Sequence, residues 1–172
     1  PGRGFSFRRD EPLDMRMDTS GGATAADLIA SADEQTLADV LYKLGEERYA
    51  RRVARAILEE GKRRRIETTG QLAAVVRRAI PRKGFSRIDP ATRTFQAIRI
   101  WVNQELEGLD AFLVQAAGRL ARGGRLVVIT FHSLEDRVVK HTLRALETSA
   151  TMAVRTRRPM EPSAAESERN PR

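Results

Sequence analysis

The feature that most constrains the fold is a short apolar run between a pair of glycines and a cluster of polar residues. Residues 126–131 read Leu-Val-Val-Ile-Thr-Phe, a nearly unbroken apolar run rich in β-branched side chains. Such a run is typical of a strand that is covered on both faces. Gly123 and Gly124 before it are a turn signal. Because doubly covered strands occur in parallel sheets flanked by helices, the sequence predicts an α/β fold.

The polar residues directly after this run are candidates for a site. His132 and Ser133 follow the predicted strand, and open α/β sheets collect ligands at the carboxyl ends of their strands. Ser133 is expected to be the N-cap of the next helix, with Asp136 bonding back to it in a capping box. Each residue alone fits an ordinary helix start, since Glu135 and Asp136 also suit the positive end of the helix dipole. Together they are more polar than a turn requires.

Composition and charge narrow the classes of protein. The 172 residues are 41% hydrophobic and carry a net charge of +8, so the chain can bury a core and still attract anions. The excess is mainly arginine, which favours a nucleic acid over a membrane, because no long apolar segment is present. The absence of cysteine excludes disulfides and a thiolate nucleophile, and two histidines argue against a metal site. No signal peptide is visible at the start, so a cytoplasmic location is expected.

The opening segment contains a short alternating pattern. Residues 13–18 read Leu-Asp-Met-Arg-Met-Asp, which predicts an extended segment with one apolar and one charged face. Asp14 and Asp18 would then flank the guanidinium of Arg16. Two interpretations are open: a local ion pair on an edge segment, which the residues alone favour, or a pair of carboxylates that serve a site.

Four helices are predicted between Thr24 and Ile80, and the third, residues 46–60, has an almost purely basic face. Capping residues mark the other starts: Thr24 with Asp27, Asp33, and Thr68 with Gln71. On the third helix, arginines recur three and four residues apart and repel one another, which costs stability. A face of this kind favours the binding of an anion, with phosphate the expected one. A basic loop follows the fourth helix, and it is either solvated or in contact with phosphate.

The longest predicted helix begins with Asp89 as its cap and Pro90 at its first position. Apolar residues then recur every three or four positions from Phe95 to Leu120, about seven turns. A long helix that leads through two glycines into a buried strand is the second half of a βαβ unit. A further helix is predicted from Leu134 to about residue 147.

Five blocks of the sequence resemble the signature blocks of one family, the MraW or ribosomal RNA small subunit methyltransferase H family. They are Gly4–Asp10, Leu13–Asp18, Tyr42–Arg48, Ala91–Ala97 and Phe131–Arg137. The resemblance implies a Rossmann-like class I methyltransferase domain with an inserted all-helical substrate-recognition domain. It implies transfer of the methyl group of S-adenosylmethionine to N4 of a cytidine in the 16S rRNA of the small ribosomal subunit.

The resemblance also implies a domain organisation. Residues 1–22 would belong to the methyltransferase domain, residues 23–89 would form the RNA-recognising insertion, and residues 90–147 would return to the methyltransferase domain. Residues 148–172 are expected to be a flexible basic tail. The family's glycine-rich cofactor loop precedes the block that begins at Gly4, so the chain resembles a C-terminal part of the enzyme. We therefore expect no cofactor-binding residue in it, and no turnover by it alone.

The chemistry that the resemblance implies suggests site residues. The N4 lone pair of cytosine is delocalised into the ring, so a site helps by accepting hydrogen bonds from N4–H and by holding the amine in line with the methyl carbon. The base must first leave its stack. Asp14, Asp18 and His132 are the catalytic candidates, with Arg16, Ser133, Glu135 and Asp136 in support. The candidates for RNA contact are Arg48, Arg51, Arg52, Arg55, Arg78, Arg82, Lys83 and Arg93.

Two other classes of function compete with this one. The helical insertion could act as a non-catalytic module that binds RNA or the ribosome. A DNA-binding helix-turn-helix is a weaker alternative, because no predicted helix pair has the short turn and isolated recognition helix of that motif. The oligomeric state stays open.

Overall fold

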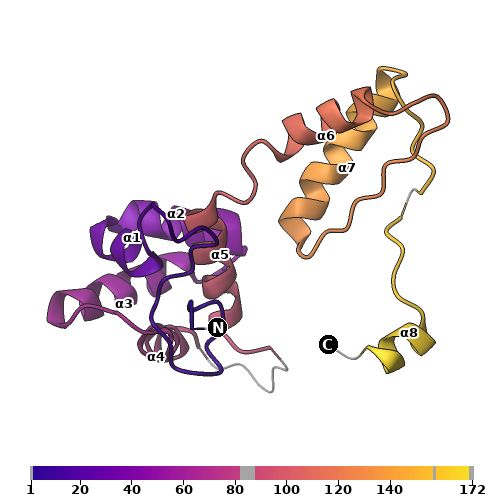
Figure 1. Cartoon of the computed structure of the whole chain (residues 1–172). Helices are drawn as coiled ribbons and strands as arrows, with labels where there is room; N and C mark the ends of the chain where they lie inside the picture. The colour runs from indigo at the N-terminus through magenta and orange to yellow at the C-terminus, as the bar shows by residue number, and fades with distance from the viewer. Residues whose placement is uncertain (1, 82–87, 157, 171–172) are drawn as a thin grey trace. The chain divides into compact units, whose positions relative to one another are not determined.

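The computed structural model of the protein describes residues 2–81, 88–156 and 158–170. These residues form eight α-helices, and no strand occurs among them (Figure 1). The chain divides into two compact units, Pro1–Glu105 and Leu106–Arg172, which are described in turn. None of the described helices is both long and apolar enough to cross a membrane.

The first unit is a bundle of five helices. They are α1 (Ala25–Ser31), α2 (Glu34–Gly45), α3 (Ala50–Arg63), α4 (Thr69–Ala79) and α5 (Ala91–Asn103). Helix α2 packs against both α3 and α5, and α4 packs against α3 (Figure 1). The predicted capping boxes of Thr24 with Asp27 and of Thr68 with Gln71 are confirmed, as is the cap at Asp33.

The core of this unit lies where the apolar faces of the helices meet. Fully buried side chains come from all five helices and include Ala25, Leu37, Val53, Leu72 and Ile98. Helix α2 approaches α5 closely at Gly45, where a Cβ atom would lie 2.6 Å from the backbone oxygen of Arg93 in α5. Only glycine fits so close an approach, which explains why the predicted helix stop at Gly45 also lies inside the core.

The opening segment runs along this bundle, and its predicted alternation is wrong at one position. Leu13 and Met15 are buried as expected, but the Met17 side chain is 54% exposed. The cause is the backbone of Met15, whose φ of 61° lies in the left-handed region. This residue turns the chain, so the residues after it no longer alternate as they would in an extended segment.

The single long helix predicted from residue 90 to residue 120 is also wrong. Helix α5 ends at Asn103, Gln104 and Gly108 adopt left-handed conformations, and α6 (Leu109–Gly118) then begins. The apolar spacing continues across the break, so periodicity alone did not reveal it. Pro90 rather than Asp89 is the N-cap of α5, and the Asp89 carboxylate accepts a hydrogen bond from the Ala91 N–H at 2.9 Å.

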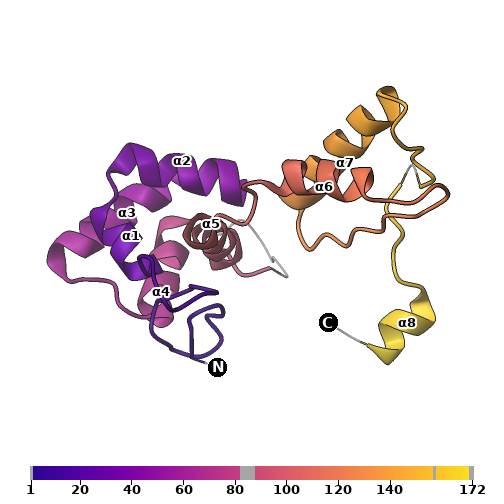
Figure 2. The same cartoon turned by 45° about the horizontal axis from the view of Figure 1, so that its top comes forward.

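The second unit consists of α6, α7 (Ser133–Thr148) and α8 (Ala164–Arg169) with the segments between them. Figure 2 shows α6 beside α7, in agreement with the contacts between the two helices. Leu113, Leu134, Val139 and Leu146 are the large side chains buried there. The short helix α8 lies in the predicted tail and buries no residue.

The predicted buried strand at residues 126–131 is not formed. Val127, Ile129 and Phe131 are about three-quarters exposed, at 75%, 74% and 73%, while the residues between them are half-buried. A strand needs a neighbour that accepts and donates its backbone hydrogen bonds. The described residues contain no strand with which this segment could pair. A sheet therefore cannot form here, although the apolar, β-branched composition of the segment favours one.

Candidate functional site

The first candidate group is the polar segment around Arg16. The Asp14 carboxylate accepts two hydrogen bonds from the Arg16 guanidinium, one from Nε at 2.6 Å and one from Nη2 at 2.9 Å. Arg16 also donates to the carbonyl oxygens of Gly21 and Gly22, at 3.3 Å each. The hydrogen bonds from Arg16 hold the pKa of Asp14 below its ordinary value. Asp14 is therefore ionised at neutral pH, and both of its oxygens are engaged.

Asp18 is placed differently from Asp14. Its Oδ1 accepts a hydrogen bond from the Ser20 N–H at 2.9 Å, and its hydrogen bonds with Ser20 lower its pKa. Arg16 acts on it through charge alone. The structure thus separates the two carboxylates. Asp14 is held by the Arg16 guanidinium, while Asp18 is exposed and hydrogen-bonds with Ser20.

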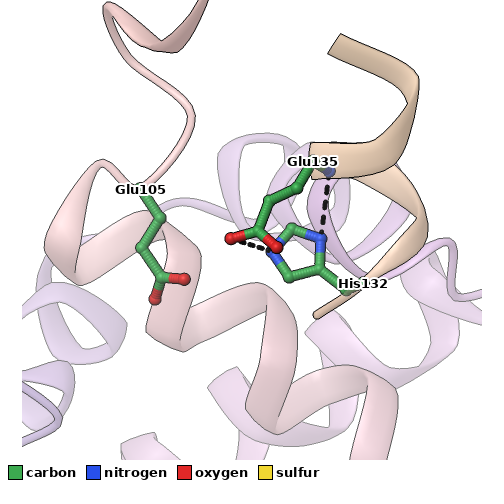
Figure 3. A group of neighbouring side chains, drawn as sticks. All are labelled: Glu105, His132 and Glu135. Carbon is green, nitrogen blue, oxygen red and sulfur yellow. Dashed lines mark hydrogen bonds and ion pairs between the residues drawn. The ribbon is translucent and has the colours of Figure 1, made fainter. Parts of the chain in front are cut away.

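The polar residues at the start of α7 lie in the second unit. His132, not Ser133, is the N-cap of α7, so the predicted cap at Ser133 is wrong by one residue. The His132 Nδ1 accepts a hydrogen bond from the Glu135 N–H at 3.3 Å, and its Nε2 lies 3.4 Å from a Glu135 carboxylate oxygen (Figure 3). Glu135 in turn accepts from the Phe131 N–H at 2.8 Å.

These bonds explain why the predicted capping box is shifted. The ring of His132 accepts from the Glu135 N–H and the carboxylate of Glu135 accepts from the Phe131 N–H, so the capping contacts lie earlier in the chain than a box of Ser133 with Asp136 would place them. Asp136, the predicted partner of Ser133, forms an ion pair with Lys140 at 2.6 Å. His132 therefore has a structural role at the helix start, and it belongs to a different unit from Asp14 and Asp18.

The second candidate group is a basic groove between α3 and α4. The groove has a volume of about 660 Å³ and a floor of small apolar side chains from both helices. Five arginines and two glutamates supply its charged lining, so its net charge is positive. The charged residues are Arg51, Arg52, Arg55, Glu59, Glu60, Arg63 and Arg78.

The structure brings four of the predicted RNA-contacting arginines to this groove and places two elsewhere. The four are Arg51, Arg52, Arg55 and Arg78. The Arg48 guanidinium instead lies over the Tyr49 ring, 5.3 Å from its centroid, and Arg93 donates to the Glu46 carbonyl oxygen at 3.3 Å. Arg82 and Lys83 lie outside the described residues.

The arginines of the groove are not equivalent. Arg55 pairs with Glu34 at 3.0 Å, and Arg78 pairs with Glu60 at 3.2 Å. Arg52 and Arg63 form no ion pair or hydrogen bond with another described side chain, so their guanidiniums are available to a ligand. They lie 11 residues apart on α3, which is about 16 Å along the helix axis at 1.5 Å per residue. Arg63 was missed in the sequence because the third helix was expected to end at residue 60.

A second residue that the sequence did not single out is Asn103, the last residue of α5. Its side-chain Nδ2 donates to the Met15 carbonyl oxygen at 2.8 Å, and its Oδ1 accepts from the Met17 N–H at 2.7 Å. No local pattern reveals such a role, because its partners are 86 and 88 residues away along the chain.

Taken together, the first unit belongs to a class of helical units with a cationic groove suited to an anionic ligand. Comparison with known proteins gives the particular family. The chain belongs to the MraW methylase family, which matches it over residues 1–172.

Curated relatives agree with this assignment. The chain is 53% identical to the ribosomal RNA small subunit methyltransferase H of Cyanothece sp., over 100% of this chain and 56% of the relative. It is 52% identical to the protein of the same name from Acidobacterium capsulatum, over 99% of this chain and 56% of the relative. The match to the one from Paramagnetospirillum magneticum is 57% over 84% of this chain and 45% of the relative. The chain thus spans about half the length of these relatives.

Proposed function

We propose that this chain is the RNA-recognising part of an enzyme that methylates N4 of a cytidine in 16S rRNA, with S-adenosylmethionine as the methyl donor. Its partner would be the rRNA of the small ribosomal subunit, in the cytoplasm. The observation that carries the proposal is the groove between α3 and α4, where Arg52 and Arg63 have no partner among the described residues. Family membership and the names of the relatives support the reaction class.

We further propose that residues 126–131 join a Rossmann-like parallel sheet that the rest of a full-length protein supplies. The support is the exposed row formed by Val127, Ile129 and Phe131, which is apolar and has no strand beside it among the described residues. Phe112 and Val114 on α6 are exposed as well, at 63% and 49%. A helix with apolar residues on more than one side is normally covered on more than one side. Both features favour a unit that is completed by further chain.

Within this proposal the carboxylates of the opening segment take different roles. S-adenosylmethionine, when bound, supplies an electrophilic methyl group, and the attacking N4 amine needs a hydrogen-bond acceptor close by. Asp18 suits this role because its carboxylate is ionised at neutral pH and exposed to solvent, where an incoming amine can reach it. Asp14 has both oxygens on Arg16, so we assign it the role of holding the segment. No residue of this chain is proposed to bind the cofactor.

The groove also favours a second candidate function. Its lining residues all lie in the first unit, so RNA binding in the groove would need no residue of α6, α7 or α8. A helical module that binds RNA or the ribosome without methylating it would use the same arginines.

The experiment that separates the two functions measures methyl transfer from labelled S-adenosylmethionine to small ribosomal subunits. The protein would be this chain extended to the length of its relatives. We expect cofactor-dependent incorporation into one cytidine, and a tight rRNA interaction that weakens with salt. Binding without incorporation would support the module and overturn the enzyme.

The same assay tests the groove through a paired substitution. Arg52→Ala with Arg63→Ala should raise KM for RNA and reduce the slope of log K against log salt by about 1.4, since each lost phosphate contact accounts for about 0.7 on single strands. Arg119→Ala with Arg122→Ala is the matched control, because it removes equal charge from exposed positions outside the groove. Equal effects of the two pairs would show that net charge, not the groove, binds RNA.

A further inference from the structure

We infer that Asn103 is a positioning residue for the proposed methyl transfer, because it braces the strained segment that carries Asp14 and Asp18. The inference rests on the proposed function, and it concerns a residue that no sequence motif singled out. The starting observation is Met15, which is completely buried and has a φ of 61°. A large side chain in the left-handed region is strained, and such strain persists only where the surroundings over-determine it.

The surroundings of Met15 hold its backbone conformation in place, because every backbone N–H from residue 13 to residue 17 has a hydrogen-bond acceptor. The acceptors, in order along the chain, are Glu67 O at 2.8 Å, Pro12 O at 3.0 Å, Arg3 O at 2.7 Å, Asp14 Oδ1 at 3.1 Å and Asn103 Oδ1 at 2.7 Å. This degree of pairing is usual in a helix or a sheet, but this segment belongs to neither.

The carbonyl groups of the segment are held in the same way. The Leu13 and Asp14 oxygens accept from the first amides of α1, at 3.0 and 2.7 Å. The Met15 oxygen accepts from Asn103 Nδ2 at 2.8 Å, and the Met17 oxygen accepts from Arg3 Nη1 at 3.0 Å. The segment is therefore fixed to α1, to the chain start and to the end of α5.

Asn103 is the part of this network that fixes the turn itself. Its carboxamide bonds to Met15 on one side of Arg16 and to Met17 on the other, as a neighbouring strand would. Its second amide hydrogen bonds to the Arg99 carbonyl oxygen at 2.8 Å, so the orientation of the group is set: a flip would place the NH₂ group against the Met17 N–H.

The contacts of Asn103 affect which side chains of the segment are exposed to solvent. After the bracing contact, the chain leaves the bundle with the Met17 side chain and the Asp18 carboxylate exposed. Asn103 therefore fixes the backbone directly before Asp18, although its own side chain bonds to Met15 and Met17. Because methyl transfer requires the amine in line with the methyl carbon, a displacement of about 1 Å can cost on the order of 100-fold in rate.

The test uses the full-length protein, with two substitutions at Asn103. Asn103→Leu keeps the branching and the number of side-chain heavy atoms and removes all three hydrogen bonds, whereas Asn103→Asp keeps the acceptor for the Met17 N–H and loses both donors. We expect kcat to fall about 100-fold for Asn103→Leu and about 10-fold for Asn103→Asp, with KM for RNA and Kd for S-adenosylmethionine unchanged. Gln115→Leu, an exposed amide on α6, is the control and should leave kcat unchanged.

Hydrogen exchange provides the second measurement, which tests the brace directly. The Met17 amide should exchange at least 10-fold faster in Asn103→Leu, while the amides of α2 keep their protection. A uniform loss of protection with an unchanged kcat per folded molecule would show a purely structural residue and overturn the inference. If the parent enzyme methylates rRNA and both variants match its kcat, the inference fails while the proposed function stands. A parent enzyme without methylation activity removes the proposed function and this inference with it.

Discussion

The two units of the molecule differ in how completely each one buries its apolar side chains and pairs its backbone hydrogen-bonding groups. The first unit closes a continuous core between its five helices, and its irregular opening segment has all its central amides bonded. The second unit buries few large side chains and leaves Phe112, Val127, Ile129 and Phe131 exposed. The difference follows from the elements: a helix satisfies its own backbone and needs only an apolar partner, whereas a strand needs the backbone of another strand.

The comparison also separates the two kinds of candidate site. The groove between α3 and α4 and the braced segment around Asp14 both lie in the first unit, and the residues that line or hold them all belong to that unit. The polar residues at the start of α7 serve the helix end. We thus propose that the first unit recognises RNA and that the second unit contributes to the methyltransferase sheet.

The largest expected effect comes from equal truncations in the two cores. Leu41 in α2 and Leu113 in α6 are both fully buried. Leu41→Ala should lower the free energy of unfolding by about 2–5 kcal/mol, because it opens a cavity in a core closed on all sides. Leu113→Ala should cost less than about 2 kcal/mol, because the small core around it can collapse. Urea unfolding followed by the fluorescence of Trp101 measures the first unit. Equal losses would contradict the comparison.

Acidification should weaken the first unit with a predictable sign. Hydrogen bonds from Arg16 lower the pKa of Asp14, and those from Thr24 lower the pKa of Asp27. An unfolded aspartate has a pKa of about 3.9, so these carboxylates stabilise the fold above that pH. The contribution is lost as the pH falls through the lower folded values. The urea midpoint should therefore be nearly constant from about pH 5 to 7 and drop below about pH 4.

Asp14→Asn isolates one part of that dependence. The variant should be less stable than the parent at neutral pH, and the gap should narrow as the pH falls below about 4, because the parent then loses the same ion pair. A gap that stays constant down to pH 3 would show that the Asp14–Arg16 pair is not the group that titrates.

The smallest effect is expected at the unpartnered segment. Ile129→Thr should change the free energy of unfolding of this chain by less than about 0.5 kcal/mol, because the Ile129 side chain is 74% exposed. In a protein of full length, where we propose that the segment is buried in a sheet, the same change should cost more than about 1 kcal/mol. Thermal unfolding of both proteins gives the two values. A cost that is equally small in both would argue against the sheet.

Much of the first unit was predictable because its signals are local. The capping boxes at Thr24 and Thr68 join residues three apart, so the partners are visible together in the sequence. The basic face of α3 follows from the helical period, which places arginines three and four residues apart on one side. The signature blocks that resemble the MraW family are also continuous stretches, and the family match confirms them.

The tertiary structure alone decided the rest, because the deciding partners lie far apart in the chain. The left-handed turn at Met15 is held by Arg3 and Asn103, and no pattern within residues 13–18 announces it. Whether an arginine of the groove is available depends on acidic residues of other helices: Glu34 engages Arg55, and Arg52 has no such partner among the described residues. The sequence by itself determined most of the helices of the first unit and the basic face of α3. The distant contacts decided where the chain turns and which charges stay open to a ligand.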